Sequence, residues 1–243
     1  MAGFSSPVNG SANPLSMALD LIISFDPNLV EIVALSLYVS LTAVLIAGVI
    51  GLPLGAALAV MRFPGRKCAI IFLNALMGLP PVFIGLTVYV VLSRSGPLGA
   101  LGILFTPTAM IIAQTILITP IIAALSRQIC EALYEIYREQ LRSLGAKSGN
   151  IILTLLWDAR VALLTAMMAG FGRAIAEVGA VFIVGGNIAH FTRVMTTAIA
   201  LETSKGNLAL AMALGLILVL LAVGVNAAAS LLGVSADLSD RTR

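Results

Sequence analysis

Long apolar runs alternate with short polar stretches along the whole chain. A helix needs about 20 consecutive, mostly apolar residues to cross a bilayer, and five runs meet that length. The pattern therefore predicts an all-α integral membrane protein with five transmembrane helices. The predicted spans cover residues 32–60, 68–92, 106–125, 161–184 and 208–232.

Prolines modify two of these spans. Pro53 lies inside the first, where a missing backbone N–H predicts a kink. The second contains GLPP at 78–81, and two adjacent prolines remove two donors, so we expect that helix to be bent or broken there. An apolar stretch at 16–25 is too short to span. It either lies at the membrane interface or is loosely held.

Composition supports the membrane assignment and excludes other classes. The chain of 243 residues is 60% hydrophobic and only 10% charged, with a mean hydropathy of +1.08. A soluble domain of this size could not bury so much apolar surface. The formal net charge of +3 is too small to suggest a nucleic acid partner.

The basic residues predict the orientation, because cytoplasmic loops carry an excess of Lys and Arg. One side of the predicted topology holds Arg62, Arg66, Lys67, Arg127, Arg138, Arg142, Lys147, Arg160, Arg241 and Arg243. The other side holds Arg94, Arg193 and Lys205. The N-terminus is thus predicted outside and the C-terminus in the cytoplasm. The expected organisation is an extracytoplasmic or interfacial segment 1–31, a transmembrane domain 32–233 with a cytoplasmic segment 127–160, and a cytoplasmic tail 234–243.

The polar stretch 131–158 is the main predicted cytoplasmic feature. Its apolar residues Leu133, Ile136, Leu141 and Leu144 recur at helical spacing. Gly145 then interrupts this helix where a positive φ would be tolerated. A turn near 149–150, with an asparagine as a possible cap, precedes a second apolar run. We expect a helix, a tight turn and a second helix that dock against a polar partner.

Arg173 and Glu177 lie in the middle of the predicted fourth span. Four residues apart, they would share a helix face. Charges at this depth are costly, so they face protein or a water-filled path. Two interpretations remain open: Arg173 assists an anion along a pathway, or the two residues form a structural ion pair.

Motifs for chemistry are missing from the sequence. It contains no Walker A motif, no HExxH and no nucleophile elbow. His190 is the only histidine, and we expect it on the outer surface rather than in a metal site. We expect no catalytic residue, metal or cofactor, and an ATPase that drove transport would be a separate polypeptide. A short interfacial helix is expected within 192–203.

The cytoplasmic segment resembles the EAA loop of ABC importer permeases. Glu139, Gln140 and Leu141 occupy its first three positions, and Gly145 occupies the glycine position. The sequence departs from the pattern at both alanines and, with Asp158, at the proline. The resemblance implies a coupling helix at about 135–150 that contacts an ATPase. The implied coupling residues are Glu139, Gln140, Leu141, Arg142, Leu144, Gly145 and Ala146.

Further motifs resemble the molybdate and sulfate branch of these permeases, over about residues 30–233. They are GLPLGAALA at 51–59, GLPPVFIGL at 78–86 and GRAIAEVGAVFIVGGNI at 172–188. Within the branch, LLWDAR at 155–160 and TRVMTTAIALETSKGNLALA at 192–211 are most similar to tungstate permeases.

This resemblance implies a type I ABC importer permease in the cell membrane. Its expected partners are a second copy in a homodimer, a cytoplasmic ABC ATPase dimer, an extracytoplasmic oxyanion-binding protein and membrane lipid. Tungstate is the expected substrate, with molybdate or sulfate as the alternative. A stand-alone secondary anion transporter is a further alternative and would need Glu177 as its coupling carboxylate. A membrane enzyme is the last alternative, and it lacks a catalytic cluster.

Overall fold

The computed structural model describes residues 14–241, with side chains described except at Arg142 and beyond Leu231. Every regular element in this part of the chain is helical, as the hydropathy pattern predicts. The elements are α1 (Pro14–Ile23), α2 (Pro27–Val60), α3 (Arg66–Met77), α4 (Pro81–Leu92), η1 (Gly99–Leu101), α5 (Pro107–Ser143), α6 (Ser148–Asp158), α7 (Arg160–Ile175), α8 (Gly179–Gly185), α9 (Met195–Ser204) and α10 (Leu208–Arg241).

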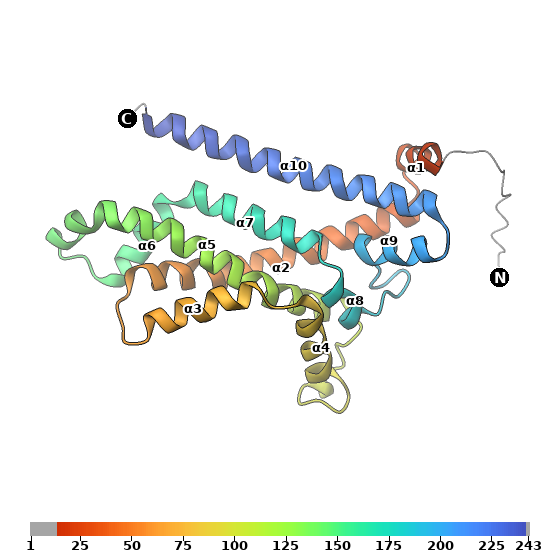
Figure 1. Cartoon of the computed structure of the whole chain (residues 1–243), viewed down its shortest axis with the longest axis horizontal. Coiled ribbons are helices and arrows are strands. Elements are labelled where there is room, and N and C mark those ends of the chain that lie inside the picture. The colour runs from red at the N-terminus through yellow and green to blue at the C-terminus, as the bar shows by residue number, and fades with distance from the viewer. Residues whose placement is uncertain (1–13, 242–243) are drawn as a thin grey trace.

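Three helices are long and apolar enough to cross a membrane without interruption. They are Pro27–Val60, Pro107–Leu141 and Leu208–Leu231. Two bent pairs add up to two more crossings: α3 with α4, at 97°, and α6 with α7, at 74°. The described residues therefore contain three to five candidate spans. In Figure 1 the long helices lie along the long axis of the molecule, whereas α4 turns away from it.

The close pairing of α2 with α5 forms the centre of the fold. Gly55 of α2 lies so near α5 that an added Cβ would be 2.3 Å from the carbonyl oxygen of Ala123. Small residues allow this approach between helix backbones. Ser126 of α5 donates a hydrogen bond to the Leu52 carbonyl oxygen at 2.9 Å, across the same contact. Pro53 is accommodated within the continuous α2.

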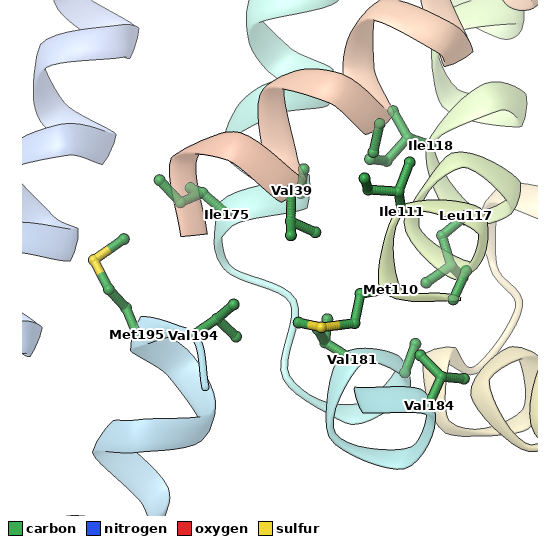
Figure 2. Packing of buried hydrophobic residues seen from close by; sticks show 14 of the residues in the cluster. Val39, Met110, Ile111, Leu117, Ile118, Ile175, Val181, Val184, Val194 and Met195 are labelled. Atoms are coloured by element: carbon green, nitrogen blue, oxygen red, sulfur yellow. The ribbon is translucent and has the colours of Figure 1, made fainter. Parts of the chain in front are cut away.

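Apolar side chains from α2, α5, α7 and α8 meet in one buried cluster. Val39, Met110, Ile118 and Val181 are almost completely buried there, and Figure 2 shows them converging from separate helices. A second buried cluster lies at the other end of α2 and includes Tyr134 and Leu155. This second cluster holds the polar segment against the bundle.

Several predicted boundaries are wrong. The span predicted at 161–184 is broken: α7 ends at Ile175 and α8 begins at Gly179. The backbone groups freed by this break find other partners, because Glu177 accepts from the Ala180 N–H and Thr196 donates to the Glu177 carbonyl oxygen. The fifth span, predicted to end at 232, lies in a longer helix, because α10 continues to Arg241.

The second predicted span is broken at its prolines, as expected. α3 ends at Met77 and α4 begins at Pro81. Proline is favoured at the first position of a helix, where no intrahelical partner is needed for the N–H that it lacks. The stretch 16–25 forms most of α1, which contacts α10. α9, at Met195–Ser204, confirms the short helix expected within 192–203.

Candidate functional site

The predicted helix, turn and helix at the basic end of the molecule are present. The first helix is the end of α5, which continues from the membrane span without interruption, and the second is α6. Gly145 has φ +67° between them. The Ala146 N–H reaches back to the Leu141 carbonyl oxygen at 3.1 Å, which closes the helix as a Schellman turn does. The expected positive φ at Gly145 is confirmed.

The range 135–150 of the implied coupling helix includes the end of α5, the turn at Gly145 and the start of α6, so the predicted interruption divides it. The expected asparagine cap is wrong: α6 begins at Ser148, with Lys147 at the N-cap position and no side-chain hydrogen bond. The second helix therefore starts three residues earlier than the turn signal indicated, at Ser148 rather than Ile151.

The apolar face predicted for the end of α5 is only partly correct. Leu133 and Leu141 pack against the second buried cluster. Ile136 and Leu144 instead point outward, with 70% and 80% of their surface exposed. The buried face is set by Tyr134 and its neighbours one and two turns away, which meet α2 and α6.

The candidate coupling residues divide by their exposure. Glu139, Gln140, Leu144 and Gly145 are exposed. Leu141 and Ala146 are half-buried against the second cluster, and the side chain of Arg142 lies outside the described residues. An added Cβ at Gly145 would meet no atom within 4 Å. The turn thus presents polar, apolar and backbone groups that the described chain itself leaves uncovered.

An ion-pair cluster that the sequence analysis missed ties this segment to the bundle. Arg66 donates to the Leu58 carbonyl oxygen at 2.7 Å and to the Glu131 carboxylate at 2.8 Å. Arg127 forms a second ion pair with Glu131 from one turn earlier on α5. The spacing of Arg127 and Glu131 was a usable signal. Arg66 is 65 residues away from Glu131, so only the folded chain reveals its role.

The Arg173–Glu177 pair forms, although not on one helix. Arg173 lies in the last turn of α7, and Glu177 lies in the break before α8. Their side chains meet at 2.6 Å, between Nη1 and Oε2. The Glu177 side chain is 4% exposed, whereas that of Arg173 is 41% exposed. The expectation that the two residues share one helix face is therefore wrong, but the ion pair that it predicted is present.

Other polar groups converge on the same break. Gln114 of α5 donates to the Ala174 carbonyl oxygen at 3.1 Å, and its own buried Oε1 has no partner among the described residues. A cavity of about 10 Å³, enough for about one water molecule, lies beside Gln114, Ser40 and Glu177. We call this set, together with Arg173 and Thr196, the α7–α8 joint.

Charged groups gather near the start of α2, at the end of the molecule that the predicted topology assigns to the outside. His190 is 69% exposed, as expected, and its Nδ1 lies 2.7 Å from a carboxylate oxygen of Glu31. A cavity of about 270 Å³ opens beside this pair, lined also by Arg193 and Asn207. Among the described residues, no group of three or more His, Cys, Asp or Glu side chains could hold a metal ion.

Glu202 of α9 is the most strongly held acid of this outer surface. Lys205 donates to its carboxylate at 2.9 Å and Asn207 at 3.0 Å. Burial pushes the pKa of Glu202 upward, but these hydrogen bonds and the charges of Lys205 and Arg193 outweigh burial and hold that pKa below its usual value.

Comparison with known proteins supports a transport role. No protein-family model matches the chain. A probable anion ABC transporter permease protein of Haloferax volcanii is 43% identical over 82% of this chain and 88% of its own length. A tungstate uptake system permease protein of Peptoclostridium acidaminophilum is 40% identical over 86% of this chain and 92% of its own.

A tungstate uptake system permease protein of Campylobacter jejuni is 37% identical over 61% of the chain and 62% of its own length. Relatives named for sulfate or molybdenum transport are more distant, at 26% to 31% identity. The similarity to the first two relatives extends over more than four fifths of the chain and is not confined to a single motif. The chain therefore belongs to the family of ABC transporter permeases for anions and is a multi-pass protein of the cell membrane.

Proposed function

We propose that this chain is the permease subunit of an ATP-driven importer for tungstate. The similarity to tungstate uptake permeases over most of the chain carries the proposal. The sparse polarity of the candidate spans agrees with it, since a transported anion must be bound weakly enough to leave. Discrimination among oxyanions would then belong mainly to an extracytoplasmic binding protein.

The proposed topology has five crossings with the N-terminus outside. Both bent pairs would each cross once, beside the three uninterrupted helices. The distribution of Lys and Arg supports this orientation, because the end that carries Arg66, Arg127 and Lys147 is much more basic than the opposite end. The Gly145 turn would then lie in the cytoplasm.

The Gly145 turn is the proposed contact with the ATPase. It is exposed, and it ends a helix that runs directly from the membrane span. Movement of a partner bound at Glu139 and Leu144 would therefore act on α5, and through Arg66 and Glu131 on the ends of α2 and α3. A homodimer would present two such turns to an ATPase dimer, whose closure would open the pathway outward.

The α7–α8 joint favours an importer over a stand-alone secondary transporter. A coupling carboxylate must be able to bind and release its ion, but Glu177 is buried and already bonded to Arg173 and to the Ala180 N–H. We propose that Glu177 positions Arg173 and holds the joint. The exposed part of the Arg173 guanidinium is the candidate contact for a passing anion.

The test is reconstitution of the chain in liposomes with its ATPase and binding protein. We expect ATP-dependent tungstate uptake, with weaker competition by molybdate and the weakest by sulfate. Equal competition by sulfate would contradict the tungstate assignment and favour the alternative within the family. Uptake that persists without an ATPase would contradict the importer and favour a secondary transporter.

A further inference from the structure

A groove beside the bend between α6 and α7 combines an apolar wall with one basic side chain. It has a volume of about 330 Å³ and lies between α2 and α7. Its lining consists of Leu52, Arg160, Val161, Leu163, Leu164 and Met167. The groove is thus apolar along its length and carries a positive charge at the first residue of α7.

The guanidinium of Arg160 keeps free hydrogen-bonding capacity. Its Nη1 donates to the Trp157 carbonyl oxygen at 3.0 Å, and its Cζ lies 5.3 Å from the centre of the Trp157 ring. No described acidic side chain forms an ion pair with it, including Asp158 two residues away. An arginine has five donors, so most of them remain available to an anion.

Apolar side chains continue past the arginine onto α6. Leu153 and Trp157 lie one turn apart and are each 73% exposed. The other side of α6 is buried, at Ile151 and Leu155. Because α6 is bent by 74° from α7, α6 lies closer to the membrane plane if α7 follows the membrane normal. A tryptophan beside an arginine on such a helix is typical of the membrane interface.

We propose that this elbow binds an anionic phospholipid of the cytoplasmic leaflet. The phosphate would contact Arg160, and one acyl chain would lie against Leu52, Leu164 and Met167. The proposal rests on the proposed topology, which makes this end cytoplasmic. A ligand that is anionic at one end and apolar along its length matches the charge and lining of the groove.

A second copy of the chain fits the same surface less well. In a symmetric contact it would bring the same basic end and the same Arg160, so like charges would approach each other, and no described acid of the chain pairs with Arg160. A phospholipid instead supplies the missing negative charge. The anionic lipid is therefore the occupant that the described side chains favour.

Trp157 makes the test direct because it is the only tryptophan in the chain. The full-length chain is reconstituted in two sets of vesicles. One set contains brominated phosphatidylglycerol and the other contains brominated phosphatidylcholine. The bromine atoms on the acyl chains quench tryptophan fluorescence, so the two sets compare how closely each lipid approaches Trp157. We expect the brominated phosphatidylglycerol to bind near Trp157 about fivefold more tightly than phosphatidylcholine, the factor that one arginine near an anionic membrane surface contributes. Arg160→Gln should remove this preference, and Arg160→Lys should retain part of it.

Arg94→Gln is the matched control, because Arg94 is also an exposed arginine and the proposed topology puts it on the opposite side of the membrane. It should leave the preference unchanged. Equal quenching by both lipids in the unaltered chain would overturn the proposal, and so would a preference that survives Arg160→Gln. Quenching by neither lipid would show that protein covers the ring. The fluorescence assay does not depend on transport. A chain that fails to take up tungstate can therefore still show the lipid preference, and the proposed function and the proposed lipid site can be rejected separately.

Discussion

Two interruptions between helices, at Gly145 and at the α7–α8 joint, differ in their surroundings. The turn at Gly145 has open space around it, and Glu139 and Leu144 beside it are exposed. The joint is crowded: Glu177 is buried and bonded to groups from α7, α8 and α9. The first interruption leaves its side chains uncovered by the described chain, whereas the second is stabilised within the chain.

This difference separates transport from stability. A change at an exposed turn leaves the buried contacts intact, so it should affect only what binds there. A change at the joint removes contacts that hold three helices, so it should affect folding first. The predictions below test that separation, from the largest expected effect to the smallest.

Gly145→Asp should give the largest effect, a loss of transport by at least about tenfold. Most non-glycine residues are strained at φ +67°, by about 1–2 kcal/mol, although aspartate tolerates this region better than most. The new carboxylate would also change the charge of the proposed ATPase contact. We expect the variant to insert and its unfolding temperature in detergent to fall by only about 2–4 °C, as measured alongside ATP-dependent uptake.

Gly149→Asp is the matched control for this change. Gly149 lies in the first turn of α6, has open space for a Cβ and does not have a positive φ. Aspartate is also favourable near a helix N-terminus. Transport by Gly149→Asp should remain close to normal. Normal transport by Gly145→Asp would remove the turn from the coupling mechanism.

Glu177→Ala should destabilise the protein by about 2–3 kcal/mol, since it removes an ion pair and leaves the buried Ala180 N–H without its acceptor. The measurement is the thermal unfolding of the purified chain in detergent. An unfolding temperature unchanged from that of the original chain would show that the joint does not depend on this carboxylate.

The double variant of Arg173→Ala with Glu177→Gln tests what the pair does. If Arg173→Ala alone impairs both assembly and uptake, and Glu177→Gln restores both, the pair has a structural role, because glutamine removes the unpaired charge but keeps an acceptor for the Ala180 N–H. If assembly recovers and uptake does not, the exposed guanidinium of Arg173 has a role in the pathway. The coupling between the two changes is read from the difference between the double and single variants.

Glu202→Gln should give the smallest effect, a difference in unfolding temperature that is visible only at acidic pH. Its folded pKa lies below its usual value, so the stability it contributes is present above the unfolded pKa of about 4.3 and is lost as the pH falls through the folded pKa. Unfolding temperatures measured between pH 6 and pH 3 should therefore fall less for Glu202→Gln than for the unaltered chain. Parallel curves for the two proteins would contradict this.

Much of the architecture follows from local sequence signals. Hydropathy locates the long helices, adjacent prolines locate the bend between α3 and α4, and the glycine after a helical run locates the turn at 145. These features depend on composition and backbone chemistry over a few residues. The spacing of Arg173 and Glu177 also predicts that they meet, and they do so although the helix between them ends.

The remaining features depend on contacts between distant segments. A hydropathy profile cannot end α7 at Ile175, because apolar residues flank Glu177 on both sides of the break. The groups that satisfy the freed carbonyl oxygens come from distant helices, Gln114 of α5 and Thr196 of α9. Likewise, Arg66 finds Glu131 only when α3 packs beside α5. The sequence by itself determined a helical, membrane-embedded anion permease with one strongly basic end. The tertiary structure decided which polar groups are buried with partners and which are left exposed for others, because burial depends on neighbours that the local sequence does not contain.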